Sequence, residues 1–74
     1  MKIRVKLFAY FRDGRFKVAD FDYAENTACR QIVADVGLKE EDLGIVMVNG
    51  RHAPLGQQLK EGDCLSLFPL VGGG

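Results

Sequence analysis

The chain has no tryptophan, two cysteines, two prolines and no net charge, since 10 basic side chains balance 10 acidic ones over 74 residues. A neutral chain lacks the basic excess on which dedicated nucleic-acid binders depend, so no nucleic-acid partner is expected. Its apolar runs, such as residues 7–11, are far shorter than the ~20 residues that cross a bilayer, so no membrane role is expected.

The cysteines have none of the spacings of a metal or redox site. Cys29 and Cys64 are far apart in the sequence, and His52 is the single histidine. We therefore expect no metal site and two packing thiols, unpaired in a reducing compartment, although a disulfide stays open. Residues 1–8 alternate charged and apolar side chains, unlike a signal peptide, so the expected location is the cytoplasm.

The short length restricts the class of function. A chain of this size buries only about 60% of the surface that its unfolded form exposes, which leaves little structure to enclose a substrate cavity. The sequence has no GxxxxGK[ST] phosphate loop and no pair of titratable residues spaced for acid–base chemistry. These absences favour a carrier, a modifier or a binding module over an enzyme.

The apolar periodicity of the first third predicts two strands. Residues 1–8 alternate apolar and charged side chains, and residues 8–11 extend that strand as an apolar run. Asp13-Gly14 then predicts a turn, after which residues 16–23 return as a second strand. Phe16 and Val18 fall on one face of this strand and Phe21 and Tyr23 on the other, which indicates a bulge or an edge position.

The middle of the chain predicts one helix, and the last part predicts further strands. Asn26 or Thr27 caps a helix that ends at Gly37 and carries an apolar stripe. Strands are expected at residues 45–48, 51–53 and 64–68, with turns at Asn49-Gly50 and Gly62-Asp63. The predicted fold is α+β, a mixed sheet of four to five strands with one main helix packed across it. The stripe residues are Cys29, Ile32, Val33 and Val36.

The chain ends in an unusual segment, Pro69-Leu70-Val71-Gly72-Gly73-Gly74. Proline restricts the backbone before and at its own position, whereas the three glycines have no side chain to pack. We therefore expect a compact domain at residues 1–68 and a flexible arm at residues 69–74. Six extended residues reach at most roughly 20 Å, enough to place the terminal carboxylate in a narrow active-site channel of another protein.

Three separated pieces carry a resemblance to a known family: Val48-Asn49-Gly50, the segment from Leu59 to Asp63, and the segment from Leu67 to Gly74, with residues 6–9 similar to the family's first strand. Together they resemble the MoaD/ThiS family of small sulfur carriers, which implies a ubiquitin-like β-grasp fold. Leu70 stands where MoaD-like members usually have a second proline, while the short length is nearer to ThiS. The resemblance thus implies cofactor biosynthesis, with molybdopterin favoured over the thiamine thiazole.

The resemblance implies chemistry at the terminal carboxylate. A partner enzyme would use ATP to adenylate Gly74, a sulfur donor enzyme would supply sulfur to give a thiocarboxylate, and a sulfur-accepting synthase would consume it. The chain itself would bind no cofactor, and would be at most the small subunit of a complex such as molybdopterin synthase. Gly72 and Gly73 would let the arm pass through the partner's channel, and the free chain would be a monomer.

The resemblance also implies partner docking by apolar residues near the arm: Phe8, Phe68, Pro69, Leu70 and Val71. Phe8 and Met47 would extend this docking patch, but core packing is favoured for both, and for Phe68 core packing and docking are equal alternatives. Two other classes of function stay open. In the first, the chain would be a ubiquitin-like modifier conjugated through Gly74. In the second, it would be a non-covalent β-grasp interaction module whose C-terminal segment has no function.

Overall fold

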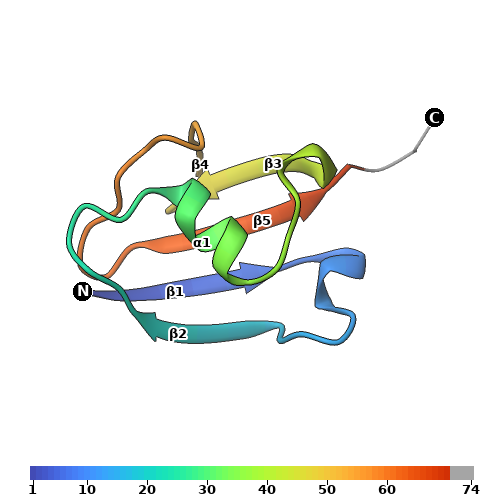
Figure 1. Cartoon of the computed structure of the whole chain (residues 1–74), viewed down its shortest axis with the longest axis horizontal. Helices are drawn as coiled ribbons and strands as arrows, with labels where there is room; N and C mark the ends of the chain where they lie inside the picture. Colours follow the sequence, from blue (N-terminus) through green and yellow to red (C-terminus); the bar gives the residue numbers. More distant parts are fainter. Residues whose placement is uncertain (71–74) are drawn as a thin grey trace.

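A computed structural model describes residues 1–70, in which five strands form one sheet in the order β2-β1-β5-β3-β4. The central strands β1 and β5 are parallel, and the other pairs are antiparallel. Helix α1 (Cys29–Asp35) lies across one face of the sheet (Figure 1). This mixed sheet with one α-helix confirms the predicted α+β fold. The strands are β1 (Lys2–Leu7), β2 (Val18–Asp22), β3 (Leu43–Val48), β4 (Arg51–His52) and β5 (Cys64–Pro69).

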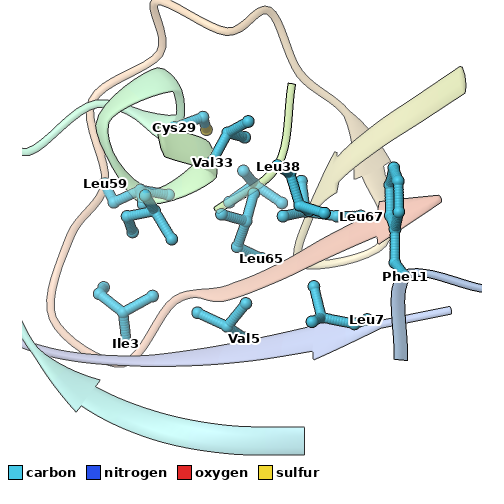
Figure 2. Packing of buried hydrophobic residues seen from close by; sticks show 12 residues of the cluster. Ile3, Val5, Leu7, Phe11, Cys29, Val33, Leu38, Leu59, Leu65 and Leu67 are labelled. Carbon is cyan, nitrogen blue, oxygen red and sulfur yellow. The ribbon is translucent and has the colours of Figure 1, made fainter. Parts of the chain in front are cut away.

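The core lies between α1 and the two central strands. Alternate residues of β1 and β5 point toward the helix, because successive side chains of a strand lie on opposite faces (Figure 2). The predicted helix stripe meets them there: its first three members are buried and Val36 is half-buried against the cluster. The buried residues of these three elements are Ile3, Val5, Leu7, Cys29, Ile32, Val33, Leu65 and Leu67.

The connection between β1 and β2 differs from the predicted strand extension. A short 3-10 helix, η1 (Ala9–Arg12), follows β1 and buries Phe11 at the end of the core. The Arg12 Nε donates to the Leu7 carbonyl over 2.7 Å, so the chain folds back at once and does not extend. Burial of Phe11 thus overrides the strand tendency of residues 8–11.

Strand β2 begins at Val18, later than the predicted position 16. Phe16 lies before the strand and packs on Phe21 with 5.3 Å between ring centroids. Phe21 and Tyr23 pack against the core and Val18 is exposed on the other face, as predicted. Phe16 also packs against the core, so its predicted place on the face of Val18 is wrong. The predicted edge position of this strand is confirmed.

The start of α1 also differs from the prediction. Ala28 occupies the N-cap position, and its N–H donates to the Gln31 side-chain oxygen over 2.7 Å. The Thr27 hydroxyl instead donates to the Ala24 carbonyl, and Asn26 adopts a left-handed φ of 68° outside the helix. The predicted caps at Asn26 and Thr27 are therefore wrong, because both residues form the preceding turn.

The predicted end of the helix at Gly37 is confirmed by its φ of 82°. Arg15 strengthens this end, since its guanidinium donates to the carbonyls of Val36 and Gly37 over 3.0 and 2.9 Å. The link ties the β1–β2 connection to the helix. A second 3-10 helix, η2 (Glu40–Asp42), then leads into β3.

The predicted glycine turns are present. Asn49 and Gly50 have φ values of 52° and 80°, as a two-residue turn between antiparallel strands requires, and they join β3 to β4. Gly14 and Gly62 likewise have positive φ.

Both cysteines are unpaired thiols. No helix within residues 1–70 is long and apolar enough to span a bilayer.

The core predicts a strong response to truncation of β5. Leu67→Ala is expected to lower the free energy of unfolding by about 2–5 kcal/mol, because the buried side chain leaves a cavity. Val18→Ala, at an exposed position of edge strand β2, is expected to change it by no more than about 0.5 kcal/mol. Urea unfolding followed by circular dichroism measures both. Equal losses in the two variants would contradict this location of the core.

Candidate functional site

The end of β5 is the start of the C-terminal segment. The strand includes Pro69, one residue beyond the predicted strand end, and Pro69 is buried opposite Leu43. The Leu70 N–H then donates to the Asp42 carbonyl over 2.9 Å, while the Leu70 side chain is exposed. The sequence analysis assigned Pro69 to the flexible arm, but Pro69 belongs to the sheet, because it pairs with Leu43 of β3.

The remaining candidate residues of the arm are Val71, Gly72, Gly73 and Gly74, and they lie outside the residues that the structure describes. Their predicted roles in docking, threading and reaction therefore stay predictions.

An apolar patch lies on the sheet face opposite α1, next to the end of β5. Phe8 and Phe68 stack there with ring centroids 4.1 Å apart and an interplanar angle of 11°. Ile45 pairs with Phe68 and is 40% exposed, and Met47 follows two residues along β3 on the same face. We call these four residues, Phe8, Ile45, Met47 and Phe68, the sheet patch.

The position of the sheet patch shows whether Phe8, Phe68 and Met47 pack in the hydrophobic core. Leu7 and Leu67 point to the helix, so the adjacent Phe8 and Phe68 point away from it. Phe8, Phe68 and Met47 are half-buried, and none of them belongs to the buried cluster of residues 1–70. The guanidinium carbon of Arg12 lies 5.3 Å from the centroid of the Phe8 ring, within cation–π range. The packing of Phe8 and Phe68 is thus with each other on an outer face.

The other end of the same face is charged. Arg4 and Asp20 form an ion pair of 2.9 Å across β1 and β2, and its hydrogen bond lowers the pKa of the Asp20 carboxyl. A shallow hollow beside this pair is lined by Lys2, Lys6 and Glu61 among others. The helix-free face is therefore polar near the start of β1 and apolar near the end of β5.

The Asn-Gly and Gly-Asp pieces of the sequence meet in one hydrogen-bonded network. Asn49 donates from its side-chain nitrogen to Asp63 over 2.9 Å and accepts the Cys64 N–H over 2.9 Å. The other Asp63 oxygen accepts the Lys60 N–H over 2.8 Å. The network fixes the start of β5 at the end of the sheet opposite Pro69. These pieces therefore have a structural role.

The groups with shifted pKa values lie away from the end of β5. Burial raises the pKa of the Cys29 thiol in α1. Burial, with a 2.8 Å hydrogen bond to Asp35, raises the pKa of Tyr23. Within residues 1–70, no three His, Cys, Asp or Glu side chains are grouped as a metal site. What the end of β5 offers is therefore an apolar surface beside the strand that continues into residues 71–74.

The sequence analysis missed three contributors at this end. Ile45 is the exposed member of the sheet patch opposite Phe68. Gly44 lies in β3 beside the Pro69 carbonyl, and the Asp42 carbonyl accepts the Leu70 N–H. The signal for Gly44 was present, because a glycine within an apolar strand often marks a bulge or a close backbone approach. A backbone acceptor such as that of Asp42 leaves no side-chain signal in a sequence.

The sheet order, the parallel central pair and the single helix across one face define a ubiquitin-like β-grasp domain. A family model described as the ThiS family matches residues 5–74. The chain therefore belongs to the ThiS family, and the predicted MoaD/ThiS membership is confirmed. Its members are ubiquitin-like sulfur carriers and modifiers.

Solved structures show the same fold over nearly the whole chain. A Pyrococcus furiosus protein assigned as subunit 1 of molybdopterin converting factor is 27% identical, with a TM-score of 0.77, covering 96% of this chain and 99% of that one. SAMP1 from Haloferax volcanii is 26% identical, with a TM-score of 0.75 and full coverage of both chains.

A lower similarity links the chain to a protein complex. The complex of subunits 1 and 2 of molybdopterin-converting factor from Helicobacter pylori has a chain that is 23% identical, with a TM-score of 0.65 and full coverage of both chains. At this identity the likeness shows the fold. A comparison with curated proteins gave no match.

The Asn49 network is expected to stabilise the fold through its side chain. Asn49→Gly keeps the left-handed conformation but removes two hydrogen bonds, so the free energy of unfolding should fall by about 1–3 kcal/mol. Asn26→Gly is the matched control, since Asn26 has a φ of 68° and is exposed. Urea denaturation compares the two. A loss for Asn26→Gly as large as for Asn49→Gly would show that the backbone, and not the network, is responsible.

Proposed function

We propose that this chain is a sulfur carrier whose terminal Gly74 is adenylated by a partner enzyme and converted to a thiocarboxylate. The observation that carries the proposal is the ThiS family match, which extends through residue 74. The sheet patch supports it, because an exposed apolar surface lies next to the strand that leads into the C-terminal segment. An apolar surface of this kind is typical of a protein-binding site.

The proposed reaction occurs at the terminal carboxylate in two steps. A carboxylate oxygen of Gly74 attacks the α-phosphorus of ATP, which releases pyrophosphate and leaves a mixed anhydride with AMP. Hydrosulfide then attacks the glycine carbonyl and AMP departs, so that sulfur replaces one oxygen. When a persulfide is the donor, a thiol must reduce the resulting acyl disulfide to release the thiocarboxylate. ATP and the sulfur source are bound by the partner enzymes in this proposal.

The sheet patch would dock these partners. Phe8, Phe68 and Ile45 expose apolar atoms in the free chain, and their burial against a partner would remove this area from water. Leu70 is 55% exposed and would extend the contact toward Val71. Pro69 is buried, so its contribution would be to hold Leu70 in place. Gly72 and Gly73 would then pass through the partner's channel, since no side chain branches from them.

Molybdopterin biosynthesis is the favoured destination of the sulfur, and the thiamine thiazole is the next. The Pyrococcus furiosus relative, at 27% identity, is assigned to molybdopterin converting factor. The Helicobacter pylori subunit of the same fold is found in a complex with subunit 2. These likenesses support a sulfur-accepting synthase as partner, with this chain as its small carrier subunit. The ThiS family match supports the thiamine alternative.

Protein modification is the second candidate function. SAMP1 from Haloferax volcanii covers the full chain, and another structure of the same fold describes the protein as small archaeal modifier protein 1. A modifier would use the same adenylation but transfer the Gly74 carbonyl to a lysine amine. Isopeptide conjugates would then accumulate. A non-covalent module would need neither Gly73 nor Gly74.

Intact-mass analysis tests the main proposal. Protein isolated from its native cell is expected to show a fraction in which sulfur replaces one oxygen at Gly74. Gly73→Val is expected to abolish that fraction, because the added side chain blocks the channel. Gly56→Ala is the control, since Gly56 lies in open space within the domain and its variant should be thiocarboxylated normally. Normal thiocarboxylation of Gly73→Val, or conjugates without any thiocarboxylate, would refute the proposal.

A kinetic test addresses the sheet patch. Phe8→Ala is expected to raise the KM for the carrier in the adenylation reaction by roughly fivefold to tenfold, as loss of one interface aromatic typically does. Tyr10→Ala is the matched control, because Tyr10 is 52% exposed on η1 and lies outside the sheet patch. Adenylation is measured by pyrophosphate release. An unchanged KM for a folded Phe8→Ala variant would remove Phe8 from the docking surface.

A further inference from the structure

The sheet face opposite α1 differs in charge from strand to strand. On β1, alternation with the buried side chains places Lys2, Arg4 and Lys6 on this face, ahead of Phe8. Strands β5 and β3, which follow β1 in the sheet order, contain no charged residue (Figure 1). The sheet patch therefore has a basic side at β1 and an uncharged side at β5 and β3.

The acidic residues around this face lie away from the sheet patch. On β2, Asp20 forms its 2.9 Å ion pair with Arg4, and Asp22 lies opposite Lys2, so both are near the start of β1. The acidic helix η2 is tied to the other side of the sheet, because Glu40 forms an ion pair with α1 over 2.8 Å. The basic side of the sheet patch is therefore not neutralised by β2 or by η2.

Two cations beside Phe8 are left without an acidic partner. Lys6 precedes Phe8 by two residues on β1, and uncharged residues lie opposite it on both neighbouring strands. Arg12 lies against the Phe8 ring, and its Nε donates to the Leu7 carbonyl, the one hydrogen bond of this side chain within residues 1–70. The ion pairs among these residues involve neither cation.

The Arg12 guanidinium is suited to bind a carboxylate of another molecule. Its terminal nitrogens keep their N–H donors, and the group is charged at any working pH. The bond to Leu7 and the contact with Phe8 hold the half-buried side chain in place, so less entropy is lost when a carboxylate binds. An apolar surface alongside would shield the new ion pair from water, which strengthens it.

We propose that the adenylating partner covers the sheet patch with an apolar surface that is acidic on one side, an inference that rests on the proposed function. A partner carboxylate would bond to Arg12, and further acidic charge would face Lys6. Apolar side chains of the partner would cover Phe68 and Ile45. Because the cations lie on the β1 side alone, such a surface fits in one orientation, and charge complementarity thus fixes how the partner sits on the sheet.

The test measures the Kd between the full chain and the adenylating enzyme purified from its native cell. Calorimetric titration at about 0.05 M and about 0.5 M sodium chloride should show the wild-type Kd rising at least about threefold, because salt screens the attraction. Arg12→Gln should weaken binding by about fivefold to tenfold at low salt and reduce the salt dependence. Lys60→Gln is the matched control, since it makes the same change in net charge at an exposed site before β5.

Two further variants separate charge from folding. Arg12→Lys loses the Nε bond to Leu7 but keeps the charge, so it should retain the salt dependence that Arg12→Gln loses. Lys6→Gln leaves the Arg12 contacts intact and decides the question if the Arg12 variants do not fold. It should weaken binding by about twofold to fivefold, the range for one exposed ion pair. The kcat for adenylation should stay within about twofold of wild type in every variant, because uniform binding alone is lost.

The inference is overturned by a wild-type Kd in folded Arg12→Gln or Lys6→Gln, by an unchanged salt dependence in both, or by an equal loss in Lys60→Gln. It also fails if the enzyme does not bind the wild-type chain. If the enzyme binds with the expected charge effects but releases no pyrophosphate, the proposed adenylation fails and the docking inference stands. Adenylation with wild-type binding in both variants gives the reverse result, so the two failures are distinguishable.

Discussion

The parallel pairing of β1 with β5 is the constraint on which the rest of the structure depends. It joins the first and last strands of the chain, from Arg4 opposite Cys64 to Leu7 opposite Leu67. Parallel neighbours need a crossover connection, and helix α1 in that connection covers the hydrophobic face of both strands. The same pairing brings the end of β1 beside the end of β5. Phe8 and Phe68 therefore stack, although they are far apart in the sequence.

Strand β5 is fixed at each end by a different kind of interaction. At its start, the side chains of Asn49 and Asp63 bond to each other and to the backbone. At its end, the stack of Phe8 on Phe68 and the burial of Pro69 act together with a close backbone contact, because Gly44 admits the Pro69 carbonyl. A polar network therefore fixes one end of β5, and apolar packing with direct backbone contact fixes the other.

The sequence predicted the features that depend on periodicity or on a required backbone conformation. Leu65 and Leu67 alternate, and Gly37 and Gly50 adopt positive φ, because these demands are local. The predictions fail where a contact with a residue far away in the sequence determines the local structure. Phe11 turns the chain into η1 to reach the core. Pro69 joins β5 because a bulge on another strand receives it. Phe8, Met47 and Phe68 were named as docking candidates by analogy, but Ile45 was missed, and the separation of all four residues from the core depends on the register of the sheet.

The stacking of Phe8 on Phe68 resolves a conflict between stability and binding. A small domain has little core, and leaving two large aromatic side chains fully in water would invite self-association. Stacked rings hide one face of each, and Arg12 lies against the Phe8 ring, so both residues are half-buried in the free chain. The remaining apolar area lies beside the end of β5, where the two rings and the Arg12 guanidinium contact one another. A partner that covers this area would meet side chains already packed together, and so would lose less entropy in ordering them.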